Sequence, residues 1–136
     1  MKEKAKRFCD LKAGDIVYYV SPYSTEFVIE ELELATDFVC NNILNTMRAT
    51  SMSGKWININ SSSWKKTVCK SESFYSTIED AAKALSDKLL KEIDHKEKDI
   101  ERYQKQVTRY VKEKGDLLKI LTSVESKNFP VKRVNY

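Results

Sequence analysis

Glycine and histidine are scarce in this sequence of 136 residues, which contains three glycines and one histidine. Gly14 and Gly54 fall in predicted turns and Gly115 in a predicted helix, so the sequence contains no glycine-rich loop of the kind that cradles phosphate groups. The one histidine, His95, falls on the solvated face of the same predicted helix. Beside Asp94, Lys96 and Glu97 this is the position of a solvated side chain, so His95 is not expected to act as a catalytic base or a metal ligand. We expect a protein that is not an enzyme and that carries no cofactor and no metal ion.

Cysteines and long apolar runs are also few. Cys9, Cys40 and Cys69 are odd in number and widely spaced, with no C-x-x-C pair, so we expect reduced, partly buried thiols. No apolar run approaches the roughly 20 residues that a membrane span requires. The N-terminus is basic but has no apolar segment behind it, so a secretory signal is not expected. These features predict a cytoplasmic protein that does not enter a membrane.

The sequence has instead a long heptad repeat between Ser76 and Val124. With Ile93 at position a, ten of the thirteen a and d positions are apolar or aromatic, which is typical of a coiled coil. At about 1.5 Å per residue the helix spans roughly 70 Å, far more than a small domain can cover. We therefore predict self-association, as a homodimer, through these residues: Leu89, Ile93, Ile100, Tyr103, Val107, Tyr110, Leu117 and Leu121.

The orientation of this predicted pairing stays open. A parallel dimer places Glu92 of one chain near Glu97 of the other, which is repulsive, and Lys96 and Lys114 fall within the seam. An antiparallel pair or a basic partner helix is the alternative. The lysines at f positions from residue 91 onward form either a basic stripe or a solvated face neutralised by acids four residues earlier.

The two ends of the helix carry further signals. Ser76 and Glu79 fit a capping box at its start. Leu85, Leu89 and Leu90 widen the apolar stripe there, so we expect this first part of the helix to pack on the preceding domain. Gly115 is a position where the helix either kinks or ends.

Residues 13–75 are rich in β-branched and aromatic residues separated by turn signals, and they predict a small β head domain. The alternation changes parity within the second predicted strand, as a bulge or sharp bend would produce. The predicted class is α+β, with a bent antiparallel sheet or an SH3-like barrel before the helix. Residues 1–12 form a basic arm, either solvated or contacting phosphates, and residues 125–136 a basic tail. The predicted strands are residues 16–20, 27–40, 43–52, 56–60 and 64–70.

Charge is divided unevenly within the head. Residues 13–47 contain six acidic and no basic residues, whereas residues 48–71 contain five basic and no acidic residues. Tryptophans interleaved with cations are typical of surfaces that bind single-stranded nucleic acid. The alternatives are that both tryptophans complete the core, or that one charged half docks a protein of opposite charge. The candidate binding residues are Arg48, Lys55, Trp56, Trp64, Lys65, Lys66 and Lys70.

Two short stretches resemble known proteins. Leu11 to Tyr18 (LKAGDIVY) resembles the opening strand of small SH3-like barrels, and Phe74 to Thr77 followed by Glu79-Asp80-Ala81 is similar to the entry of a C-terminal helix in short uncharacterised proteins of phages and mobile elements. The resemblance implies a viral or mobile-element accessory or structural protein, located in the host cytoplasm or in the virion. The leading hypothesis is a non-enzymatic assembly protein that self-associates through its helix and holds a protein partner with its head. The alternative is a nucleic-acid-binding protein.

Overall fold

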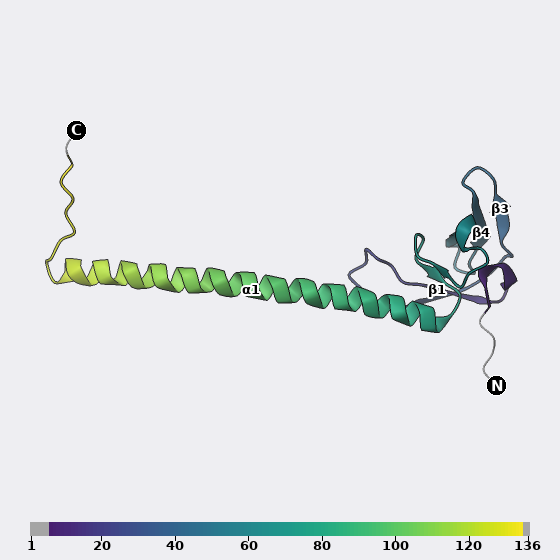
Figure 1. Ribbon diagram of the computed structural model, residues 1–136, viewed down its shortest axis with the longest axis horizontal. Helices are drawn as coiled ribbons and strands as arrows, with labels where there is room; N and C mark the ends of the chain where they lie inside the picture. Colours follow the sequence, from purple (N-terminus) through teal and green to yellow (C-terminus); the bar gives the residue numbers. More distant parts are fainter. Residues whose placement is uncertain (1–5, 135–136) are drawn as a thin grey trace. The chain divides into compact units, whose positions relative to one another are not determined.

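The computed structural model describes residues 6–134, which form two small antiparallel β-sheets followed by one long α-helix (Figure 1). The predicted α+β class is confirmed, but the described strands do not close into a barrel. The first sheet has the order β2-β1-β7-β6 and the second the order β3-β4-β5. The elements are η1 (Phe8–Asp10), β1 (Ile16–Tyr19), β2 (Glu30–Glu33), β3 (Val39–Asn41), β4 (Thr46–Thr50), β5 (Trp56–Asn60), η2 (Ser61–Ser63), β6 (Val68–Cys69), β7 (Phe74–Tyr75) and α1 (Ile78–Glu125).

The first sheet is buried on both faces because its side chains alternate between two clusters. Val17 and Phe74 contribute to the main core cluster, which also holds Ile57 and Ile59 of the second sheet. Tyr75 and Val20 belong to a smaller cluster with Ala81 of α1. The sheet β2-β1-β7-β6 therefore packs against the other sheet on one side and against the start of the helix on the other.

The core also includes the segment that the sequence assigned to a basic arm. Phe8 is completely buried and Leu11 nearly so, and both pack in the main cluster. The backbone N–H groups of Phe8 and Cys9 donate to the carbonyl oxygens of Lys66 and Trp64, each at 3.0 Å. The prediction of a solvated or phosphate-contacting arm is therefore wrong from Phe8 onward, because an aromatic ring and two backbone hydrogen bonds anchor this segment. Residues 1–5 lie outside the described part of the chain.

Several predicted strand boundaries are wrong. The predicted strand 27–40 consists of β2 and β3, separated by a turn and by an isolated bridge between Leu34 and Ser51, which agrees with the predicted bend. Residues 42–45 form the β3–β4 turn instead of the start of a strand. Of the predicted strand 64–70, only Val68–Cys69 is extended, and Phe74–Tyr75 forms a strand instead of a simple lead into the helix.

The N-terminus of α1 is capped one residue later than predicted. The Thr77 hydroxyl accepts a hydrogen bond from the N–H of Asp80 at 3.2 Å, and it donates to the Asp80 carboxylate at 2.9 Å. Ser76, the predicted cap, instead donates to the carbonyl oxygens of Lys6 and Thr67. An aspartate in the first turn also complements the helix dipole.

The first turns of α1 hold the β1–β2 loop. Lys88 Nζ donates to the carbonyl oxygens of Ser24 and Glu26, both at 2.8 Å, and it lies 4.6 Å from the centroid of the Phe27 ring. Leu85 packs against the smaller core cluster, as predicted for the start of the helix. Leu89 and Leu90, which were expected to pack there too, are exposed.

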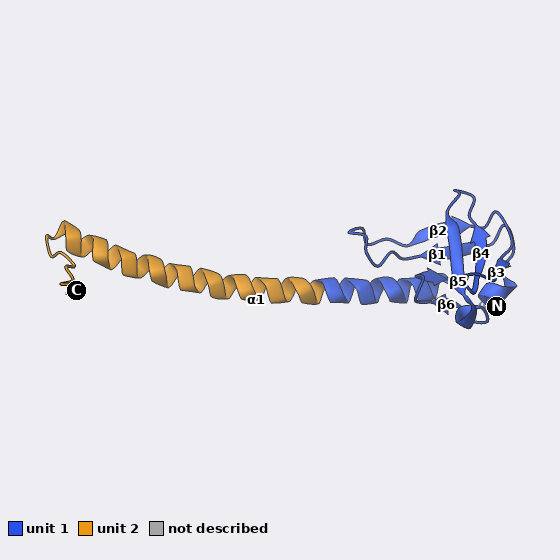
Figure 2. Cartoon of the chain, turned by 90° about the horizontal axis from the view of Figure 1, so that it is seen from above, with its two compact units in different colours: residues 1–92 blue, residues 93–136 orange. Residues whose placement is uncertain are grey.

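The helix continues through Gly115 and ends at Glu125. The N–H of Lys127 donates to the carbonyl of Val124, and the N–H of Asn128 donates to the carbonyl of Ser123. With Lys127 at a φ of 61°, these bonds form a Schellman motif. The chain divides into two compact units, residues 1–92 and residues 93–136, and α1 contributes to both (Figure 2).

Candidate functional site

The second sheet presents a polar outer face because β4 and β5 alternate between core and solvent. Ala49, Ile57 and Ile59 are buried on the inner side. The register pairs Arg48 with Asn58 and Thr50 with Trp56 on the opposite side. We call that side the outer face; its residues on β4 and β5 are Thr46, Arg48, Thr50, Trp56, Asn58 and Asn60.

Arg48 and Trp56 form the centre of the outer face. The guanidinium carbon of Arg48 lies 4.7 Å from the centroid of the Trp56 ring, within the range of a cation–π interaction. Arg48 Nε also donates to Asn58 Oδ1 at 3.0 Å, which fixes the guanidinium above the indole. Trp56 is 57% exposed, and Val39, directly opposite Arg48 on β3, is 65% exposed. An exposed tryptophan oriented by an arginine is typical of a binding surface.

The β3–β4 turn displays two further apolar side chains. Ile43 is 94% exposed and Leu44 58% exposed. The side chain of Asn41 accepts hydrogen bonds from the N–H groups of both residues, at 3.2 and 3.4 Å. The turn thus holds two aliphatic side chains in solvent at the edge of the same sheet, which favours contact with another protein.

A shallow cavity of about 360 Å³ lies beyond the end of β5. Two lysines, Lys66 and Lys70, line it together with hydroxyl and amide groups. Two cations beside neutral hydrogen-bonding groups suit an anion such as phosphate. The remaining lining residues are Asn60, Ser63, Val68 and Ser71.

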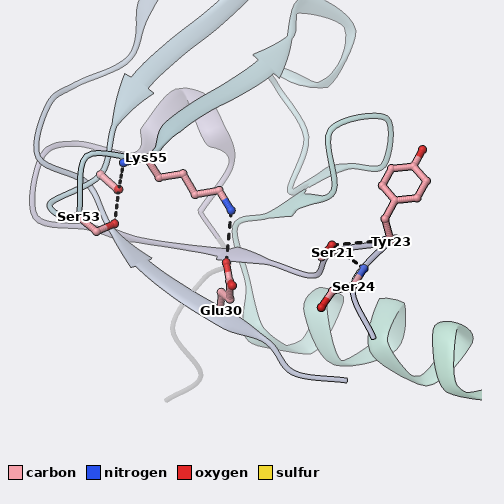
Figure 3. A network of polar contacts seen from close by, with 7 residues as sticks. Ser21, Tyr23, Ser24, Glu30, Ser53 and Lys55 are labelled. Carbon is pink, nitrogen blue, oxygen red and sulfur yellow. Dashed lines mark hydrogen bonds and ion pairs between the residues drawn. The ribbon is translucent and has the colours of Figure 1, made fainter. Parts of the chain in front are cut away.

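Two of the predicted binding residues are used inside the head instead. Lys55 Nζ lies 3.3 Å from Glu30 Oε2 (Figure 3), so this lysine joins the basic and acidic halves of the head. The same Nζ lies 3.5 Å from the centroid of the Tyr19 ring. Trp64 is half-buried against the core, with its ring centroid 5.4 Å from that of Phe38. Both were candidate binding residues, and both are held by contacts within the chain; for Trp64 this agrees with the alternative that it completes the core.

The other predicted head residues fall into two groups. Arg48 and Trp56 share the outer face, whereas Lys66 and Lys70 line the cavity. Lys65 is exposed but does not line the cavity. Asn60 belongs to both groups, and at about 3.3 Å per residue it lies roughly 13 Å along β5 from Trp56.

The second candidate surface is the apolar row on α1 within residues 93–124. Ile93 is 52% exposed and Leu117 is 66% exposed, and the other predicted self-association residues of this unit are at least half exposed. The side of α1 that carries the f-position lysines has ion pairs, including Asp94–Lys98 at 3.1 Å and Glu101–Lys105 at 3.9 Å. The lysines at f positions are thus partly neutralised, whereas the apolar row is exposed to solvent.

Groups with chemical reactivity do not converge in the described residues. His95 is exposed on α1. Cys69 is buried and Cys9 half-buried, but Cys40 is exposed, so the prediction of a partly buried thiol is wrong for Cys40. Within residues 6–134, no three histidine, cysteine or acidic side chains are grouped in a way that could hold a metal ion. No helix in this part of the chain is long and apolar enough to cross a membrane.

Sequence reasoning missed several residues of these surfaces. Val39 and Asn58 flank Arg48 on the outer face, and Ile43 and Leu44 form the exposed turn. The alternation of WININ could have identified Asn58, because isoleucine and asparagine must face opposite sides of one strand. No comparable signal marks Ile43 and Leu44, because two aliphatic residues after a turn are equally typical of a buried strand.

Comparison of the chain with protein-family models, with curated proteins and with solved structures gives no match.

Proposed function

We propose that this protein is a non-enzymatic assembly protein that self-associates through α1 and binds a protein partner with its β head. The observation that carries the proposal is the row of exposed apolar side chains between Ile93 and Val124, which only Lys96 and Lys114 interrupt. Single exposed apolar residues are normal on a protein surface, but a row with heptad spacing marks an interaction site.

The outer face and the β3–β4 turn support a protein as the partner of the head. Tryptophan and arginine are the residue types that most often dominate binding energy at protein interfaces. Val39, Ile43 and Leu44 add aliphatic surface around them. The resemblance of the sequence to accessory proteins of phages and mobile elements agrees with such an assembly function.

Light scattering tests the self-association. The unmodified protein is expected to be a dimer at tens of micromolar. Replacing Ile100 and Val107 by Asp should yield a monomer whose head remains folded, because each substitution places a carboxylate in the apolar row. The matched control replaces Thr108 and Thr122, on the opposite side of the helix, by Asp, which adds the same charge and should leave the dimer intact. A monomeric unmodified protein would contradict the proposal.

A second candidate function is the binding of single-stranded nucleic acid by the head. Two observations favour it: the arginine-supported Trp56 on the outer face and the two lysines of the cavity near the end of the same strand. Base stacking on an aromatic side chain is worth about 1–3 kcal/mol per base, and lysines contribute phosphate contacts.

Titration with a single-stranded oligonucleotide at about 50 mM salt tests this second function. Binding should quench tryptophan fluorescence and weaken with salt, with a log–log slope near −0.7 for each phosphate contacted. Lys66→Glu combined with Lys70→Glu should abolish binding, whereas Lys127→Glu combined with Lys132→Glu in the tail should not. Absence of both quenching and a gel shift at tens of micromolar would leave a protein as the partner.

A further inference from the structure

We infer that the segment Ile93–Val124 pairs in antiparallel orientation with the same segment of a second copy, with Val107 of one chain opposite Tyr110 of the other. This inference rests on the proposed self-association and adds its geometry. The residues concerned, which we call the seam, are Ile93, Lys96, Ile100, Tyr103, Val107, Tyr110, Lys114, Leu117, Leu121 and Val124.

A parallel, in-register pair brings like charges together. Each seam residue of a parallel dimer faces the same residue of the other chain. Lys96 would face Lys96 and Lys114 would face Lys114 inside an apolar interface, where a charge is poorly solvated. Both lysine pairs would lie on the two-fold axis of a parallel dimer.

The antiparallel register removes these repulsions. It places Ile93 opposite Val124, Ile100 opposite Leu117, Lys114 opposite Tyr103 and Lys96 opposite Leu121. Each lysine then lies against a ring or an aliphatic side chain, along which its stem can pack while the ammonium group reaches water.

The residues that flank the seam agree with this register. In antiparallel coiled coils, positions e and g face their own kind on the other chain. Glu97 then neighbours Leu118, Asp99 neighbours Ile120, and Glu113 neighbours Gln106 of the second copy. No acidic residue of the segment faces another acidic residue, and the exposed Leu118 and Ile120 become covered.

The end of the helix selects this register over its neighbours. A shift of one heptad in one direction places Lys96 opposite Lys114, which restores a repulsion. A shift in the other direction moves the partner of Ile93 beyond Glu125, where α1 ends. The proposed register keeps both lysines apart and covers about 45 Å of the seam on each chain.

Cysteine cross-linking tests the orientation, with Cys9 and Cys40 replaced by Ser and the buried Cys69 retained. The two variants are Ile100→Cys and Leu117→Cys, each first confirmed as a dimer by light scattering. In the antiparallel register the two copies of residue 100 lie about 25 Å apart, so neither variant should form a disulfide with itself. An equimolar mixture of the two, exchanged by unfolding and refolding, should form a disulfide between residues 100 and 117, identified by peptide mass. Thr108→Cys, on the opposite side of the helix, is the control and should form none.

The outcomes separate this inference from the proposed function. A disulfide that Ile100→Cys or Leu117→Cys forms with itself would show a parallel dimer and overturn the inference, but not self-association. A dimeric mixture without the 100–117 disulfide would overturn the register. A monomeric unmodified protein would overturn self-association itself.

Discussion

Phe8 provides the sharpest test of the head, because the sequence places it in a solvated arm and the structure places it in the core. Its side chain is completely buried in the main core cluster. Replacing a buried phenylalanine by alanine typically costs about 3–5 kcal/mol, the sum of lost transfer energy and a residual cavity. Small domains are stable by only about 5–15 kcal/mol in total. Phe8→Ala should therefore remove a large fraction of the stability of the head, and deletion of residues 1–11 should unfold it.

Urea unfolding followed by tryptophan fluorescence measures this effect. Trp64 packs against the core and reports on its disruption, whereas the exposed Trp56 changes less. With a denaturant slope of about 1–3 kcal/mol per molar urea, the midpoint for Phe8→Ala should fall by about 1 M or more. Arg7→Ala is the control, because an exposed side chain usually changes stability by less than about 0.5 kcal/mol. Equal midpoints for Phe8→Ala and Arg7→Ala would refute the assignment of this segment to the core.

Three further predictions concern other parts of the chain. Lys88→Met removes the two hydrogen bonds to the β1–β2 loop, so proteolysis within residues 21–29 should accelerate, whereas Lys83→Met, at an exposed position of the same helix, should have no effect. Gly115→Ala should stabilise α1 by about 1 kcal/mol, measured as a higher melting temperature by circular dichroism, because a Cβ at this position meets nothing within 4 Å beyond its chain neighbours and the adjacent backbone of its own helix. Burial raises the pKa of Tyr75 above its usual 10.0, so the unfolded chain loses this proton first and the free energy of unfolding should fall as the pH rises past about 10. Urea titrations between pH 9 and 11 should show a weaker pH dependence for Tyr75→Phe, and an identical dependence would contradict the assignment.

The elements predicted correctly from the sequence are those with an internal period. The heptads of α1, the alternation of WININ and the dense β-branched and aromatic run IVYY are local signals, and the structural bounds of these elements lie close to the predicted ones. The predicted strand 64–70 had no such support. Residues 64–66 instead accept backbone hydrogen bonds from Phe8 and Cys9, more than fifty residues earlier in the chain. A contact of this separation leaves no local pattern.

The difference between a local sequence pattern and a contact between distant residues also explains the two candidate tryptophans. Trp56 belongs to a strand in which every second residue is buried, so its exposure follows from the burial of Ile57 and Ile59. Trp64 follows η2, where the two-residue period no longer applies, and its burial depends on packing against Phe38. Lys55 is similar, because its pairing with Glu30 depends on how β2 and β5 approach each other. Residue composition therefore indicated a cationic aromatic surface, but only the three-dimensional contacts determine which of its members face solvent.

The orientation of the helix pair bears directly on the kind of partner that the head can hold. In the antiparallel register the two Ile93 residues lie at opposite ends of the paired segment, about 45 Å apart, whereas a parallel pair would place them side by side. If the chain pairs as we infer, only a partner that offers at least two copies of the bound surface gains affinity from a second contact. A repeating assembly or a long polymer meets this condition, whereas a small monomeric protein with one site does not.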